Sequence, residues 1–494
     1  MSSIKRFLGQ TAIYGVSTVV SRLFNFILTP LFTGVFQPVV YSIFTKMYAS
    51  ASLFNAILAF GMESTFFRYL NKHEDKKQEV YNNSFLCIAF IAGLFLVSGL
   101  VFSTPIAAYF AGGPEEMDDY KKFVHYFVWL LFVDAICVIP FAKVRADERP
   151  IRFSMIKFVN IGCFIGFNLI FLFLIPAIIK WGGPVGVWFG GWYRTEWIGY
   201  VFISNLIASI ITLLLLIPEL LQLQFKFDKV LFRKMVSYSW PVLVANLSFV
   251  INEHLDKMVI EQLGVSEHDL GVYGAVCKIA VFLSLFITAF RLGAEPFFFS
   301  HAKNVNARQT YATILHYFVV ALAVIFVGLI ANIELLKYFI DENYWSGLTA
   351  VPFLLLGYVF LGIYINLSIW YKLSDQTRFG LYISVAGALT TIVLNLILVP
   401  KYGYMGSAWV SLFAYFIMMV LSYTLGQKHY PIPYNVKRIL AYLFLSVILV
   451  VLSFWVFNRN IYIGNALLLA FAAGIFYLEK DQLKGILIKS NKDN

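Results

Sequence analysis

The sequence has 494 residues, of which 60% are hydrophobic and 13% are charged, and its formal net charge is +11. A soluble protein carries about a quarter charged residues, so this composition excludes an ordinary soluble domain. It also excludes an outer-membrane barrel, because the apolar runs are long and do not alternate with polar residues. The composition therefore predicts an all-α polytopic membrane protein.

Taken in chain order, the apolar segments predict about 14 transmembrane helices, each long enough to cross about 30 Å of hydrocarbon. The first segment follows Lys5 and Arg6 and shows no small-residue cleavage site, so we interpret it as a membrane helix and not a signal peptide. The predicted segments are 8–36, 41–67, 82–110, 123–142, 153–175, 199–221, 235–263, 271–293, 311–333, 347–371, 379–399, 404–425, 439–456 and 461–478.

Lysine and arginine divide unequally between the two sets of connecting segments. If the N-terminus is cytoplasmic, the inner segments hold 26 of these residues and the outer loops hold 7. Positive residues concentrate on the cytoplasmic side of membrane proteins, so both termini are expected in the cytoplasm. Because topology accounts for most of the positive charge, no nucleic acid partner is expected.

Residues 41–67 align without a gap to 273–299, with nine identities in 27 positions. Composition alone would give about two identities. A looser match at a similar offset relates 152–186 to 378–406. The identical pairs in the first match are Tyr41/Tyr273, Lys46/Lys278, Ser52/Ser284, Leu53/Leu285, Phe54/Phe286, Gly61/Gly293, Glu63/Glu295, Phe66/Phe298 and Phe67/Phe299.

This duplication predicts two pseudo-symmetric six-helix lobes, 1–225 and 226–428, followed by two extra helices and a tail in 429–494. Each copy has an even number of spans, so both have the same orientation and their symmetry axis runs along the membrane normal. Carriers use such parallel repeats to expose one site to alternate sides of the membrane, which favours a transporter.

A charged stretch lies inside the apolar segment Ser237–Gly264. Asn252 and Asp256 share one face of the expected helix, and Glu253 and Lys257 share the adjacent face. Charged residues at membrane depth usually face a polar cavity, so this helix is expected to line one, with Glu253 and Asp256 in a coupling or gating role. The alternative is a structural Glu253–Lys257 ion pair that only joins two helices.

Arg22 and Asn25 in the first segment are candidates for contact with an anion in the same cavity. The alternative for Arg22 is a structural pair with Asp256. The repeat-related Lys46 and Lys278 enter their helices from the outer face, and with Lys257 they predict a cationic chamber. The alternative is snorkelling of the lysines to the interface.

Glu63 and Glu295 mark the expected cytoplasmic ends of their helices. Arg68 follows Glu63 and Arg291 precedes Glu295 by one turn, so salt bridges that close the inner mouth are expected, with proton coupling as the alternative.

Asp134 lies in the middle of its predicted span. It is either a coupling site or a partner for Lys157.

The outer loop 176–198 holds four tryptophans, which form either an interfacial belt or a surface that stacks on sugar rings. The sequence has no catalytic, metal-binding or nucleotide-binding motif, so neither an enzyme nor a cofactor is expected. Transport energy would then come from an ion gradient, with proton or sodium as coupling ion, or from the gradient of the substrate.

Five stretches carry a family resemblance. SRLFNFILTPLFTG, GMESTFFRYL, KVRADERPIRF, the segment from Asn252 to Gly264 and GVYGAVCKIA resemble Wzx-type polysaccharide flippases of the multidrug/oligosaccharidyl-lipid/polysaccharide exporter superfamily. The resemblance implies two six-helix lobes in a V with two extra C-terminal helices. Members commonly have Asp-Arg where this chain has Asp256-Lys257, so bidentate gripping of a phosphate is not expected there.

The resemblance implies movement of undecaprenyl-pyrophosphate-linked oligosaccharide from the inner to the outer leaflet of a bacterial inner membrane. Membrane lipid, a polysaccharide polymerase and glycosyltransferases are the implied partners. Three alternatives stay open: a peptidoglycan-precursor flippase, an ion-coupled multidrug exporter, and a polymerase or acyltransferase enzyme.

Overall fold

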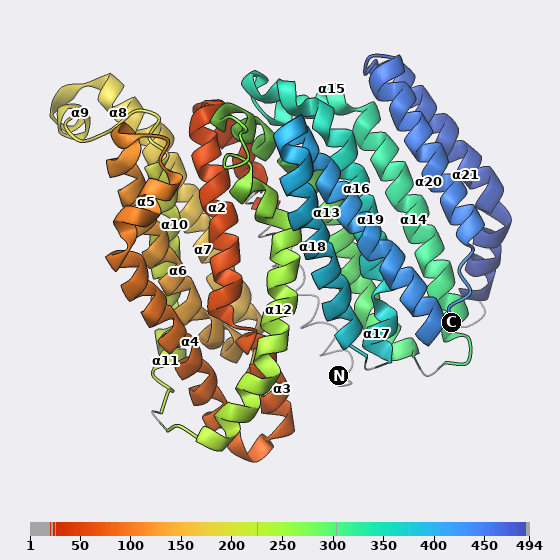
Figure 1. Cartoon of the computed structure of the whole chain (residues 1–494), viewed down its shortest axis with the longest axis horizontal. Helices are drawn as coiled ribbons and strands as arrows, with labels where there is room; N and C mark the ends of the chain where they lie inside the picture. The colour runs from red at the N-terminus through yellow and green to blue at the C-terminus, as the bar shows by residue number, and fades with distance from the viewer. Residues whose placement is uncertain are drawn as a thin grey trace. The chain divides into compact units, whose positions relative to one another are not determined.

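The computed structural model describes residues 20, 23–24, 26–224, 226–302, 304–374 and 376–490. All regular secondary structure in these residues is helical, as Figure 1 shows. Contacts between residues divide the chain into two compact units, unit 1 (Met1–Gly274) and unit 2 (Ala275–Asn494).

Twelve helical segments in the described ranges are long and apolar enough to cross a membrane, and Phe26–Val35 and Gly199–Leu215 are shorter apolar helices. The twelve long helices correspond to twelve predicted segments, Gly199–Leu215 lies in 199–221, and Phe26–Val35 lies in 8–36, most of which is outside the described residues. The all-α polytopic fold is confirmed. The long segments are Pro38–Lys72, Lys77–Val101, Pro114–Ala146, Pro150–Trp181, Lys229–Val259, Glu267–Phe299, Ala307–Ala331, Glu342–Leu373, Arg378–Tyr402, Tyr404–His429, Val436–Val456 and Ile461–Lys480.

Unit 1 is built around α6, which packs against α2, α3, α4, α5, α7 and α10. Proline begins α2 and α7, where its fixed φ suits the first helical turn and its missing N–H costs nothing. The helices of this unit are α2 (Pro38–Ala59), α3 (Met62–Lys72), α4 (Lys77–Val101), α5 (Ser103–Phe110), α6 (Met117–Ala146), α7 (Pro150–Leu169), α8 (Ile175–Trp181), α9 (Gly183–Gly190), α10 (Gly199–Leu215), α11 (Ile217–Leu220) and α12 (Lys229–Val259).

A break between α2 and α3 provides the surface on which α12 packs. Phe60 and Gly61 both have positive φ, 49° and 63°, which ends α2 and starts α3 in a new direction. A methyl group at Gly61 would lie 2.8 Å from the Ser239 carbonyl oxygen, so α12 approaches closely only because this residue is glycine. Tyr69 on α3 secures the contact by donating a hydrogen bond to the Lys234 carbonyl at 2.9 Å.

Unit 2 contains most of α13 (Glu267–His301), whose first residues belong to unit 1. Its densest packing joins α16 to α19 and α18 to α19, while α14 packs against α16, α20 and α21. The remaining elements are α14 (Ala307–Ala331), α15 (Ile333–Leu336), α16 (Val351–Leu367), α17 (Ile369–Leu373), α18 (Arg378–Tyr402), α19 (Tyr404–His429), α20 (Val436–Val451) and α21 (Ile461–Ser490).

The two C-terminal helices, α20 and α21, are held to the rest of unit 2 by Glu479, which lies buried on α21. Its carboxylate accepts a hydrogen bond from the Tyr442 hydroxyl at 2.6 Å and lies 3.1 Å from His316 Nε2. Arg438 Nε is 3.5 Å from the same oxygen. A buried carboxylate with these partners ties α14, α20 and α21 together.

Equivalent local contacts support the predicted duplication. A methyl group at Gly186 would lie 2.8 Å from the Ile178 carbonyl oxygen, and one at the repeat-related Gly406 would lie 2.7 Å from that of Leu398. The lobe boundaries expected at 225 and 428 stay a prediction, because a compact unit defined by contacts need not coincide with a duplicated sequence unit.

Candidate functional site

Asp256 is the centre of the charged stretch on α12, and its carboxylate is buried. The Tyr273 hydroxyl donates to Oδ2 at 2.6 Å, and Lys257 Nζ lies 3.0 Å from Oδ1 and 3.1 Å from Oδ2. Lys257 also donates to the Glu253 backbone carbonyl at 3.1 Å. The carboxylate paired with Lys257 is therefore Asp256, whereas the alternative considered from the sequence was Glu253.

Asn252 and Asp256 are both buried, at 2% and 3% exposure, which confirms that they share a face of α12. Glu253 is more exposed, and its carboxylate lies 3.9 Å from His254 Nε2. The face with Asn252 and Asp256 is therefore the one that α12 turns toward the protein interior.

Lys46 on α2 lies in a second group of charges, which we call the Lys46 cluster: Lys46, Glu261 and Glu267. The lysine is 2% exposed, and its Nζ lies 3.1 Å from Glu261 Oε2 and 3.2 Å from Glu267 Oε1. The Phe110 carbonyl oxygen accepts a further hydrogen bond at 3.2 Å. Lys46 is thus compensated by two carboxylates and is neither an uncompensated cation nor a lysine that snorkels to the interface.

The other predicted cavity residues fall in two places. Lys278 is half-buried on α13 in unit 2, and its predicted pairing with Lys46 across a cleft stays a prediction. Arg22 and Asn25 lie outside the described residues.

The repeat-related glutamates both form ion pairs, with partners other than those expected. Glu63 pairs with Arg145 at the end of α6, and Glu295 pairs with Lys372 on α17. Arg145 and Lys372 end the fourth and tenth spans, so the two pairs are equivalent under the repeat. Salt bridging by the two glutamates is confirmed. The predicted partners Arg68 and Arg291 are wrong, because the partners are Arg145 and Lys372.

Arg68 instead stacks over an aromatic ring, and Arg291 is exposed. The Arg68 guanidinium lies 4.2 Å from the centre of the Tyr238 ring, a cation–π contact that holds this α3 side chain against α12. Sequence proximity favoured these two arginines because each lies within about a turn of its glutamate, but the chain fold brings a more distant cation closer.

Asp134 and Lys157 line one polar cavity of about 330 Å³ in unit 1. Asn160 and Thr212 line it as well, and the Asn160 amide donates to the Thr212 hydroxyl at 2.9 Å. The structure therefore brings together the two residues that the sequence offered as partners, and both predicted roles for Asp134 stay open.

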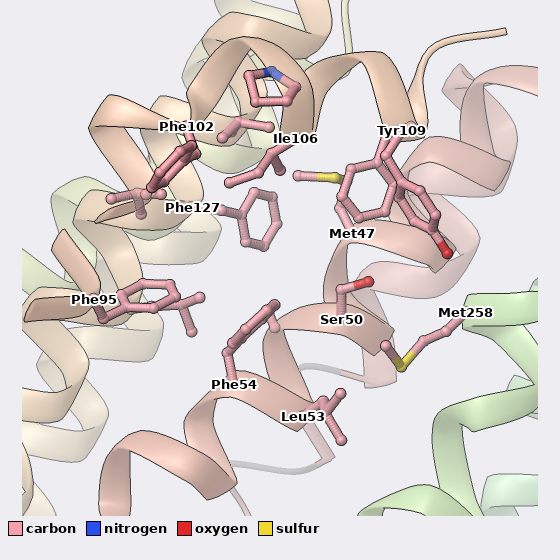
Figure 2. Close-up of a pocket in the computed structure, with 17 residues that line it drawn as sticks. Met47, Ser50, Leu53, Phe54, Phe95, Phe102, Ile106, Tyr109, Phe127 and Met258 are labelled. Carbon is pink, nitrogen blue, oxygen red and sulfur yellow. The ribbon is translucent and has the colours of Figure 1, made fainter. Parts of the chain in front are cut away.

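A larger pocket of about 540 Å³ lies between α2, α4, α5 and α6 of unit 1 and is almost entirely apolar. Figure 2 shows phenylalanine rings from these helices around it, with Met47 on one side and Met258 of α12 on another. Phe110 lines the pocket, and its carbonyl oxygen accepts the hydrogen bond of Lys46, so the pocket adjoins the Lys46 cluster. Hydropathy alone did not indicate it, because its lining comes from helices that are equally apolar on several faces.

The tryptophan loop is only partly packed. Trp181 and Trp188 on α8 and α9 are exposed, whereas Trp197 packs edge-on against Tyr200 at 5.0 Å. Figure 1 shows α8 and α9 projecting past the ends of the neighbouring helices of unit 1. Both interpretations of the tryptophans, interfacial belt and sugar stacking, stay open.

Several solved structures share this fold, among them one named as a flippase and others named as transporters. The lipid II flippase MurJ in an inward closed conformation is similar with a TM-score of 0.69 at 15% identity, over 96% of this chain and 100% of that one. An outward-facing multidrug resistance MATE family transporter has a TM-score of 0.60 at 12% identity, over 89% and 96%. DinF-BH in complex with R6G has a TM-score of 0.57 at 16% identity, over 87% and 97%.

The MatE family model matches residues 241–397, and a search of curated protein sequences found no match. The fold and the family matches together define a membrane flippase or exporter of the multidrug/oligosaccharidyl-lipid/polysaccharide exporter superfamily. Within this class, the chain belongs to the polysaccharide biosynthesis protein family, whose model matches residues 7–301 and therefore more than half of the sequence.

Proposed function

We propose that this protein is a flippase that moves undecaprenyl-pyrophosphate-linked oligosaccharide from the inner to the outer leaflet of a bacterial inner membrane by alternating access. Its termini are cytoplasmic in this proposal, and it is a carrier, not an enzyme. The observation that carries the proposal is the match of residues 7–301 to a polysaccharide biosynthesis family in a chain with the fold of a lipid flippase.

Lys46 and Lys257, which are paired with carboxylates, are the proposed binding groups for the pyrophosphate. A pyrophosphate offers more negative charge than one carboxylate, so it competes with Asp256 for Lys257 and with Glu261 and Glu267 for Lys46. Arg22, Asn25, Asn252 and Lys278 are the remaining proposed substrate contacts. Exchange of partners lets a buried lysine stay compensated in both the empty and the loaded state.

The same exchange supplies a reason for ion coupling. When a lysine turns to the pyrophosphate, the buried Asp256 or one of the half-buried Glu261 and Glu267 loses its countercharge. An uncompensated buried carboxylate is costly and takes up a proton or a cation instead. The coupling ion is then a proton or sodium bound to these carboxylates during the loaded step.

Two other functions have an observation in their favour. The likeness to MurJ favours a flippase for a peptidoglycan lipid precursor, which also carries a pyrophosphate. The MatE match over 241–397 favours a multidrug exporter. The ion-pair exchange argues for an anionic headgroup over a cationic drug, since a drug cation gains nothing from displacing a lysine.

Complementation separates the three functions. The gene is expressed in a strain without its polysaccharide flippase, a strain depleted of its lipid II flippase, and a strain without drug exporters. We expect surface polysaccharide to return in the first strain, and no rescue of growth or of dye resistance in the other two. Rescue of lipid II transport or of dye resistance, without surface polysaccharide, contradicts the proposal.

The site is tested in the same strain with the double variant Asp256→Asn/Lys257→Met, which removes the pair without leaving a buried charge. We expect it to abolish surface polysaccharide at unchanged protein level. The matched control is Lys401→Met, an exposed lysine at the end of α18, which should leave the polysaccharide unchanged.

A further inference from the structure

The apolar pocket of unit 1 offers few polar groups that would orient a polar ligand. Its walls are mostly phenylalanine, methionine and aliphatic side chains, with Ser50 and Tyr109 as the polar exceptions. The Ser50 hydroxyl already donates to the Lys46 carbonyl at 2.8 Å. With a volume of about 540 Å³, the pocket is the size of a ligand site, and its chemistry suits hydrocarbon.

The pocket lies at the depth of the hydrocarbon, as its position along α2 shows. Met47 and Phe54 line it, and they are separated by about 10 Å of helix inside the candidate membrane span Pro38–Lys72. On α4, the neighbouring residues Val97 and Val101 are exposed, as expected of side chains that face lipid. The natural occupant of such a pocket is therefore a lipid chain and not a soluble apolar molecule.

The Lys46 cluster borders this pocket. The Phe110 carbonyl that accepts the hydrogen bond of Lys46 belongs to a lining residue, and Met258, another lining residue, follows Lys257 in the sequence. Figure 2 shows Met258 and Ser50 among the residues that line the pocket. A ligand that fits both parts has a long hydrocarbon chain joined directly to a charged headgroup.

The rigidity of the walls favours one chain of defined shape. A methyl group at Gly99 would lie 2.6 Å from a Val128 methyl, so α4 and α6 are packed closely beside the pocket. Within a membrane, binding draws on van der Waals fit and not on the hydrophobic effect, since lipid tails are as apolar as the pocket. A wall of aromatic rings therefore discriminates by shape between a branched isoprenoid chain and straight acyl chains.

We propose that this pocket binds the polyprenyl chain of the substrate, at the segment next to the pyrophosphate. The inference rests on the proposed function and names the part of the substrate that is recognised. Holding the chain beside Lys46 raises the effective concentration of the headgroup at that lysine. Recognition then depends on the chain and the pyrophosphate, whatever the sugar.

The test uses the purified full-length protein in nanodiscs with a photoreactive, diazirine-bearing polyprenyl phosphate. Labelled peptides should map to α2, α4, α5 and α6, and undecaprenyl phosphate should displace the label while phosphatidylglycerol should not. Ala51→Phe and Leu53→Trp fill the pocket and should each lower labelling by about tenfold, because overpacking removes the space for the chain. Val97→Phe, on the exposed face of α4, is the matched control and should label as the wild type does.

Two readouts keep the outcomes distinct. Leu53 is only half-buried, so this variant is expected to fold even where Ala51→Phe does not, and thermal unfolding of both is measured. Equal displacement by phosphatidylglycerol, or full labelling of the folded filled variants, overturns the pocket inference. Complementation separates the pocket inference from the flippase proposal. Labelling of the pocket in a protein that restores no surface polysaccharide contradicts the flippase proposal. Full surface polysaccharide in both filled variants contradicts the pocket inference.

Discussion

Glu295 on α13 forms an ion pair with Lys372 on α17. The repeat-related Glu63 forms the equivalent pair with Arg145 in unit 1, again between the second and the fourth span of its half. Each unit has thus kept the same charged contact at the same helix end, although the cation is lysine in one and arginine in the other. We propose that this contact, present in both copies, has the same task in the transport cycle of each unit.

Reversing one of these pairs tests that task. Glu295→Lys is expected to reduce transport strongly and to lower stability by only about 1 kcal/mol, because half-exposed ion pairs contribute little to folding. The double variant Glu295→Lys/Lys372→Glu restores the pair and should restore surface polysaccharide in the complementation assay. A double variant as inactive as the single one would show that the pairing itself is not needed.

The Tyr273 hydroxyl is expected to stabilise the charged end of α12. Tyr273→Phe removes the 2.6 Å hydrogen bond to the buried Asp256 and should cost about 1.5–3 kcal/mol, the range for hydrogen bonds to charged groups. The free energy of unfolding is measured by titration with SDS. Tyr462→Phe, at an exposed tyrosine, is the control, and equal stability of the two variants would contradict the role assigned to Tyr273.

For the Lys46 cluster, we expect a triple variant to be more stable than the single variant that lacks only the lysine. Lys46→Met leaves Glu261 and Glu267 without their cation and should destabilise unit 1 by about 3–5 kcal/mol. Lys46→Met/Glu261→Gln/Glu267→Gln removes the uncompensated charge and should recover most of that loss. The apparent melting temperature of the purified variants checks this, and a triple variant less stable than the single one is the opposing result.

The start of α12 gives a pH dependence of known sign. The Leu231 backbone N–H and the Lys76 ammonium lower the pKa of the Asp228 carboxyl below its usual value. Its contribution to stability is therefore present above the unfolded pKa of about 3.9 and is lost as the pH falls through the lower folded pKa. Asp228→Asn, which keeps a capping side chain, should be less stable than wild type at pH 7 and equal to it near pH 2. A stability difference that does not shrink with acidification contradicts this assignment.

The helices and their order could be predicted from the sequence because hydropathy is local: about 20 apolar residues in a row define a span wherever they pack. The partners of the charged residues could not. Lys46 pairs with Glu261 and Glu267, which are 215 and 221 residues away, and no periodicity connects them. For Lys257, helical spacing favoured Glu253, but Tyr273 on the next helix holds the Asp256 carboxylate where the lysine reaches it.

The most direct measurement is translocation in proteoliposomes that contain only this protein and a fluorescent undecaprenyl-pyrophosphate-linked oligosaccharide. The fraction of substrate that a membrane-impermeant lectin reaches is followed after an ion gradient is imposed. The account predicts that wild type and Lys401→Met move the substrate across the bilayer and that Asp256→Asn/Lys257→Met does not. Equal translocation by the double variant, or none by the wild type while it exports a cationic dye, would contradict it.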